Sequence, residues 1–125
     1  MSGKIKGLAH IGVFVKDMET SVKFYRDTLG FTVTDVHNNL TFCNIGTCLI
    51  ELVEIKDYQP RTPGQVDHIA VEVENIEELV AELRAKGVEL PEKIGEMPTL
   101  LGGVKNIFFV GPDGERIELF EYTNR

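Results

Sequence analysis

The sequence predicts an α+β protein built from two tandem copies of one βαβββ module. Two stretches of the chain are alike: "LAHIGVFVKDMETSVKFYRDTLGF" at 8–31 and "VDHIAVEVENIEELVAELRAKGV" at 66–88. Each opens with a histidine followed by isoleucine, alternates as a strand does, and continues with a helical pattern. Three β-like runs then follow each helix. Repetition of this kind within one chain indicates duplication of a structural unit.

The first module is expected over about residues 5–55. Residues 8–15 alternate along a strand and place His10 and Phe14 on one face. In "DMETSVKFYRDTLG" the apolar residues fall at helical spacings, and Gly30 stands where a helix ends. The runs "FTVTDV", "LTFCNI" and "TCLIELVEI" are separated by turn-forming residues, which predicts three strands.

The second module is expected over about residues 66–122 and repeats this order. A strand is predicted in "DHIAVEVEN", and a helix in "IEELVAELRAKG" that ends at Gly87. A short strand is predicted near "VEL" at 88–90, followed by strands in "KNIFFV" and "ERIELFEY" around the turn "GPDG".

Two segments lie outside this pattern. Residues 56–65, "KDYQPRTPGQ", carry two prolines and a glycine without a hydrophobic period, which is typical of a linker. Residues 91–103 have no counterpart of that length in the first module, so this loop is a candidate lid.

Composition limits the class of protein. With 125 residues, 42% hydrophobic and 26% charged, residues 1–125 are expected to form one globular domain. A net charge of −7 disfavours nucleic acid and anionic membranes as partners. No apolar run is long enough for a membrane span and no signal peptide is evident, so a cytoplasmic protein is expected. In that compartment Cys43 and Cys48 are expected to be reduced and to carry no chemistry.

Four residues of metal-ligand type occupy matching positions in the two modules. They are His10, Glu51, His68 and Glu118. A carboxylate within an apolar strand needs a partner, because an unpaired buried charge is costly. If the modules pack about a pseudo-twofold axis, the two pairs converge, and two carboxylates neutralise a divalent ion. Such nitrogen and oxygen ligands suit nickel, zinc, cobalt, iron or manganese.

The alternative for each of these residues alone is structural. A histidine at a strand start is more often a structural residue than a ligand, and a glutamate in an "IEL" context could face solvent. The matched pairing of all four favours metal binding.

The motifs "HIGVFVKDMETSVKFYRDTLGF", "LIELVE", "DHIAVEV" and "GPDGERIELFEY" resemble the vicinal oxygen chelate superfamily, which includes glyoxalases, bleomycin resistance proteins and dioxygenases. The likeness spans about residues 8–122 and is greatest to glyoxalase I, or lactoylglutathione lyase. It implies that the paired modules form a cupped mixed sheet around the metal. It also implies that the metal ligands are His10, Glu51, His68 and Glu118, and that the ion is nickel or zinc first, with cobalt, manganese or iron as further choices.

The resemblance further implies a metal-dependent isomerase or lyase that moves a proton next to a carbonyl through a metal-bound enediolate. Glu118 is the expected base, with Glu51 as its pseudo-symmetric alternative. The substrate implied is the hemithioacetal of methylglyoxal and glutathione, a small molecule. The candidate pocket walls are Phe14 and Phe120, and the candidate cations for the glutathione carboxylates are Arg61, Lys105 and Arg116.

Other members of the superfamily remain as alternatives. An enzyme resembling methylmalonyl-CoA epimerase would use the same proton chemistry, although that family usually has glutamine in place of Glu51. A drug-binding protein of the bleomycin-resistance type needs no metal. Extradiol dioxygenases and fosfomycin-resistance enzymes generally use three protein ligands. Modules of this kind pair, so a homodimer is expected, with each site formed within one chain or across two.

Overall fold

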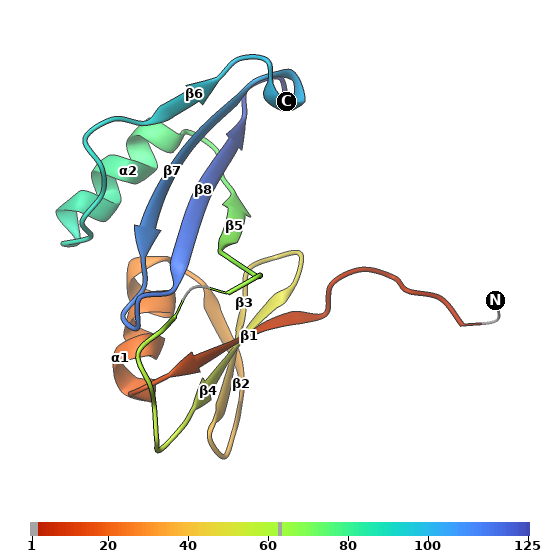
Figure 1. Cartoon of the computed structure of the whole chain (residues 1–125), viewed down its shortest axis with the longest axis vertical. Helices are drawn as coiled ribbons and strands as arrows, with labels where there is room; N and C mark the ends of the chain where they lie inside the picture. Colours follow the sequence, from red (N-terminus) through yellow and green to blue (C-terminus); the bar gives the residue numbers. More distant parts are fainter. Residues whose placement is uncertain (1–2, 63) are drawn as a thin grey trace. The chain divides into compact units, whose positions relative to one another are not determined.

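The computed structural model describes residues 3–62 and 64–125, and the chain divides into two compact units between Gln59 and Pro60. Each unit contains one four-stranded mixed sheet with helical segments (Figure 1). The predicted α+β fold of two βαβββ modules is therefore confirmed. The prediction of a single domain over 1–125 with a linker at 56–65 stays a prediction.

The first unit follows the order βαβββ. Its elements are β1 (His10–Val15), α1 (Met18–Val22), η1 (Lys23–Thr28), β2 (Thr32–His37), β3 (Leu40–Asn44) and β4 (Leu49–Glu54). The strand order in space is β1-β4-β3-β2, with β1 parallel to β4 and the other neighbours antiparallel. The first strand of the module therefore lies beside its last, which brings β1 residues next to those of β4.

The second unit repeats this topology. Its elements are β5 (Ile69–Glu72), α2 (Ile76–Ala85), β6 (Gly95–Met97), η2 (Leu100–Gly102), β7 (Val104–Val110) and β8 (Arg116–Tyr122). The strand order is β5-β8-β7-β6, with β5 parallel to β8. Each unit therefore pairs its first strand with its last, as duplication requires.

The cores follow the alternation of the strands and the apolar stripe of each helix. In the first unit Val15, Cys43 and Leu52 are fully buried, together with Tyr25. In the second unit α2 packs on the sheet with buried side chains on one face, and its polar face is exposed (Figure 1). The opposite faces of β1 and β5 thus remain available for functional side chains.

The single helix predicted at 17–30 is divided in the structure. Asp17 caps α1 by accepting a hydrogen bond from the backbone N–H of Thr20 at 3.1 Å, as an N-cap residue does. From Lys23 the turn widens into a π-helix. Within this wider turn Tyr25 is buried and its ring stacks on Phe31. Local periodicity does not distinguish a π turn from an α turn, so the sequence indicated only the helix.

The short strand expected near 88–90 was wrongly placed. The strand is β6, inside the segment 91–103 that was expected to be a loop, and it pairs with β7 in the register Gly95↔Asn106. Pro91 lacks a backbone N–H and is unsuited to a sheet ladder, so pairing begins only beyond it. The proposed lid role of 91–103 stays a prediction.

Two further expectations concern location and cysteines. In the described part of the chain, no helix has the length and apolar character needed to cross a bilayer. Cys43 and Cys48 are both free thiols, and Cys43 is buried. Burial raises the pKa of the Cys43 thiol, with the charge of Arg26 opposing this shift.

Candidate functional site

The structure brings His10 and Glu51 together in the first unit. His10 opens β1, and Gly12 on the same strand face lies in register with Glu51 of β4. The Nε2 atom of His10 is 3.6 Å from Oε1 of Glu51, and both side chains are only partly buried. A Cβ added at Gly12 would lie 3.3 Å from Oε1 of Glu51. The glycine therefore leaves the carboxylate room to lie close over β1.

The second unit brings His68 and Glu118 together in the same way. His68 immediately precedes β5, and Ala70 of β5 lies in register with Glu118 of β8. The Nε2 atom of His68 is 3.0 Å from Oε1 of Glu118. The Glu118 side chain is only 7% exposed, against 20% for that of Glu51. The two glutamates therefore occupy equivalent strand positions with different degrees of burial.

A phenylalanine completes each pair. Phe42 of β3 lies opposite Glu51, and its ring meets the His10 imidazole edge-on at 5.8 Å between centroids. Phe108 of β7 lies opposite Glu118, and its ring meets His68 edge-on at 5.0 Å. The duplication thus extends to a histidine, glutamate and phenylalanine in each unit. Sequence reasoning missed both phenylalanines. Each is the third residue of a matching strand segment, "LTF" in the first unit and "NIF" in the second.

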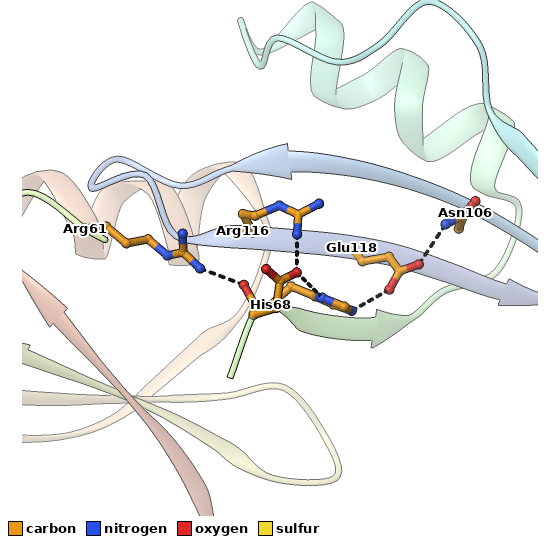
Figure 2. Close-up of polar contacts among 6 residues, drawn as sticks. Arg61, His68, Asn106, Arg116 and Glu118 are labelled. Atoms are coloured by element: carbon orange, nitrogen blue, oxygen red, sulfur yellow. Dashed lines mark hydrogen bonds and ion pairs between the residues drawn. The ribbon is translucent and has the colours of Figure 1, made fainter. Parts of the chain in front are cut away.

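The second pair carries additional polar contacts, shown in Figure 2. Nδ1 of His68 is 2.8 Å from Oδ2 of Asp67, and Arg116 donates to the same carboxylate oxygen. The amide of Asn106 donates to Oε2 of Glu118 at 2.8 Å. The hydrogen bond with His68 holds the pKa of Asp67 below its usual range, with further contributions from Arg116 and Arg61.

Two of the three predicted substrate-binding cations lie near His68, and the third pairs with a helix. Arg61 donates to the backbone carbonyl of Asp67 at 2.7 Å, and the Arg116 guanidinium lies 4.4 Å from the centroid of the Phe108 ring. Both therefore lie beside His68. Lys105 instead pairs with Glu77 of α2 at 2.5 Å, and this contact raises the pKa of the Lys105 ammonium. Lys105 is thus occupied by the helix.

The predicted pocket aromatics differ as well. Phe14 is 64% exposed at the end of β1, which leaves its ring available for contact. Phe120 lies on β8 and meets the Tyr122 ring edge-on at 5.2 Å between centroids. Their role as walls of a pocket stays a prediction.

The donor chemistry of the second pair fits a metal ion. Ionised Asp67 only accepts hydrogen bonds, so Nδ1 of His68 is the donor, and in a neutral ring Nε2 then presents a lone pair to Glu118. Two acceptors 3.0 Å apart require a proton or a cation between them. Ligands about 2.1 Å from one ion lie about 3.0 to 3.4 Å apart at angles of about 90 to 109°. The spacings of 3.0 and 3.6 Å are close to that range.

Each pair supplies two ligands and belongs to one unit. Among residues 3–62 and 64–125, no group of three or more histidine, cysteine or acidic side chains is arranged to hold a metal by itself. The meeting of His10, Glu51, His68 and Glu118 at one ion therefore stays a prediction.

Comparison with known proteins agrees with the fold. Residues 7–119 match the model of the Glyoxalase/Bleomycin resistance protein/Dioxygenase superfamily. The chain is 27% identical over 124 residues to Virulence protein STM3117 of Salmonella typhimurium, covering 95% of this chain and 86% of that protein. It is 32% identical over 99 residues to the mitochondrial methylmalonyl-CoA epimerase of Mus musculus, covering 68% of this chain and 56% of the epimerase.

A solved structure is similar over nearly the whole chain. The glyoxalase family protein from Enterococcus faecalis superposes with a TM-score of 0.78 at 26% identity, covering 93% of this chain and 98% of that one. The family match extends over most of the chain and includes all four predicted ligand positions. Glu118 lies one residue before the end of the matched range. The chain belongs to the glyoxalase/bleomycin resistance protein/dioxygenase superfamily, the vicinal oxygen chelate superfamily.

Proposed function

We propose that the protein is a metal-dependent enzyme of glyoxalase I type, which transfers a proton at a carbon next to a carbonyl. The observation that carries the proposal is the repeated pair of ligands, with Nε2 to Oε1 distances of 3.6 Å for His10 and Glu51 and 3.0 Å for His68 and Glu118. These four side chains would hold one divalent ion, nickel or zinc in the first instance. Two carboxylates balance its charge.

When bound, the ion supplies a Lewis acid that stabilises negative charge on two neighbouring substrate oxygens. The chain's own contribution is the removal and return of the proton. Glu118 is proposed as the base, because its carboxylate is surrounded by protein and would exchange a proton with little competition from water. Glu51 is the pseudo-symmetric alternative and is the more exposed of the two.

A thiol adduct of a 2-oxoaldehyde is the proposed substrate, with Arg61 and Arg116, which both contact Asp67, as the candidate cations for an anionic substrate group. The second candidate reaction is epimerisation next to a thioester. Its support is the 32% identity to a protein named methylmalonyl-CoA epimerase. Both reactions begin with removal of a proton from a carbon next to a carbonyl. The isomerase returns the proton to the neighbouring carbon, and the epimerase returns it to the other face of the same carbon.

Activity assays separate these functions. The protein is purified without chelator, reconstituted in parallel with nickel and zinc, and supplied with methylglyoxal plus glutathione or with methylmalonyl-CoA in deuterated water. Isomerisation of the adduct of methylglyoxal and glutathione supports the glyoxalase reaction. Deuterium incorporation into methylmalonyl-CoA, with no isomerisation of that adduct, supports the epimerase. A fully metallated protein that acts on neither refutes both, and a binding protein of the bleomycin-resistance type becomes the reading to test.

We further propose a cytoplasmic homodimer. Light scattering should give twice the 14.0 kDa of one chain. Mixing His10→Ala with Glu118→Ala subunits then tests where the sites form, because only sites shared between two chains can regain an intact ligand set from these variants. A monomer in light scattering refutes the dimer.

A further inference from the structure

The two ligand pairs have unequal support. In the second unit His68 follows Asp67, and Arg116 stands two residues before Glu118 on β8. The corresponding positions in the first unit hold Ala9 and Leu49. The first histidine therefore has no acidic neighbour to which its Nδ1 could donate at the position equivalent to Asp67.

The contacts in the second unit form a continuous chain (Figure 2). Arg116 donates to Oδ2 of Asp67, and the same oxygen is 2.8 Å from Nδ1 of His68. The far nitrogen of the ring, Nε2, is 3.0 Å from Oε1 of Glu118. Because the backbone carbonyl of Asp67 also accepts from Arg61 at 2.7 Å, the residue is held through both its side chain and its backbone.

Resting on the proposed metal site, we propose that Asp67, held by Arg116, is a positioning residue that keeps His68 in the Nδ1–H form with Nε2 free to bind the metal. Arginine has only donors, so the Asp67 oxygen that Arg116 hydrogen-bonds must act as an acceptor. The same oxygen, Oδ2, is then an acceptor for Nδ1–H of the imidazole. A partner of this type on the second nitrogen of a metal-binding histidine sets its tautomer and its ring orientation.

The aromatic contacts restrict the ring in a second way. Phe108 meets His68 edge-on, and the Arg116 guanidinium covers the Phe108 ring at 4.4 Å. Arg116 thus contacts two of the groups that border the imidazole, Asp67 and Phe108. Nothing comparable is available to Leu49 in the first unit, so His68 is the ligand that is fixed before the metal binds.

Replacing Asp67 by alanine tests this, because Arg116 and Nδ1 of His68 share one acceptor, Oδ2 of Asp67, which alanine lacks. Nδ1 of His68 then has no acceptor there, whereas Nε2 still lies 3.0 Å from Oε1 of Glu118. The neutral ring should therefore carry its proton on Nε2, where it blocks the metal. Asp67→Asn is the conservative variant: its amide oxygen can take the place of Oδ2 and accept from both donors, so it should keep the proton on Nδ1.

The tautomer is read from ring ¹⁵N shifts of metal-free protein at about pH 8.5, well above the ordinary histidine pKa of about 6.5. His10 in the same spectrum is an internal reference, and Asp35→Ala is the matched control that removes the same side chain from an exposed strand position. Zinc affinity is measured by competition with a chromophoric chelator. We expect a loss of about 10- to 100-fold in Asp67→Ala and none in Asp35→Ala.

The outcomes separate this inference from the proposed function. A His68 that keeps its proton on Nδ1 in Asp67→Ala, or zinc affinity in Asp67→Ala equal to that of Asp35→Ala, overturns the inference. A reversed tautomer in a protein whose wild type binds no metal upholds the positioning by Asp67 and refutes the metal enzyme.

Discussion

The hydrogen bond from Asn106 to Glu118 is expected to stabilise the second unit measurably. Glu118 is 6% exposed, and the amide nitrogen of Asn106 lies 2.8 Å from its Oε2. Removing a hydrogen bond to a charged group costs about 1.5 to 3 kcal/mol, because the buried oxygen loses a partner that water cannot replace. The contact of His68 with Oε1 remains, so we expect Asn106→Ala to lower the free energy of unfolding by about 2 kcal/mol.

Native-state hydrogen exchange of the metal-free protein measures this effect strand by strand. The opening free energy of amides in β7 and β8 should fall by the stated amount. Lys105→Gln is the matched control, since it removes the neighbouring residue's ion pair with Glu77, which is 57% exposed. An exposed ion pair contributes less to stability, because water screens its charges. Equal effects of the two substitutions would refute the argument, because they would show that burial of Glu118 gives the contact no added strength.

Three further predictions follow from the same geometry. Gly95→Ala should destabilise the second unit, because an added Cβ would lie 2.5 Å from Oδ1 of Asn106. The loss of stability should be smaller in an Asn106→Ala background, and additive effects in this double-mutant cycle would contradict the contact. Glu118→Gln should lose most turnover while retaining some metal, measured by steady-state kinetics and elemental analysis, and unchanged turnover would remove Glu118 as the base. Cys43 should react slowly with a thiol reagent in the folded protein, because burial raises the pKa of its thiol. The contribution of the protonated Cys43 thiol to the free energy of unfolding is complete below the unfolded-state pKa of about 8.5 and is lost as pH rises through the higher folded-state value. A free energy of unfolding that does not change with pH in the alkaline range would contradict this.

The repeat predicted the fold because it contains both periodicities. Alternation in "HIGVFV" and helical spacing in "IEELVAELRA" are local signals, and both elements form as predicted. The same reasoning paired His10 with Glu51 and His68 with Glu118, since equivalent positions in a duplicated module occupy equivalent places. Strand β6 was misplaced because its three residues carry no reliable alternation, and its position is set by antiparallel pairing with β7.

The phenylalanines escaped prediction for a related reason. Phe42 and Phe108 contact the histidines only because β3 and β7 lie opposite the glutamate-bearing strands in a particular register. A shift of one residue would turn each ring to the other face of its sheet. The sequence contains the matching positions, but the register that makes them meaningful is set by turns and by packing.

The contact between Asp67 and His68 could not be anticipated, because the geometry of the predicted strand argues against such a contact. Neighbouring residues in a strand point to opposite faces, so a predicted strand "DHIAVEVEN" would separate the two side chains. In the structure β5 begins only at Ile69, and both residues precede it. The backbone before the strand is free of the alternation, and the carboxylate can reach Nδ1 of its own neighbour at 2.8 Å. A shortened strand is therefore what allows the acidic residue beside the predicted ligand to act on it.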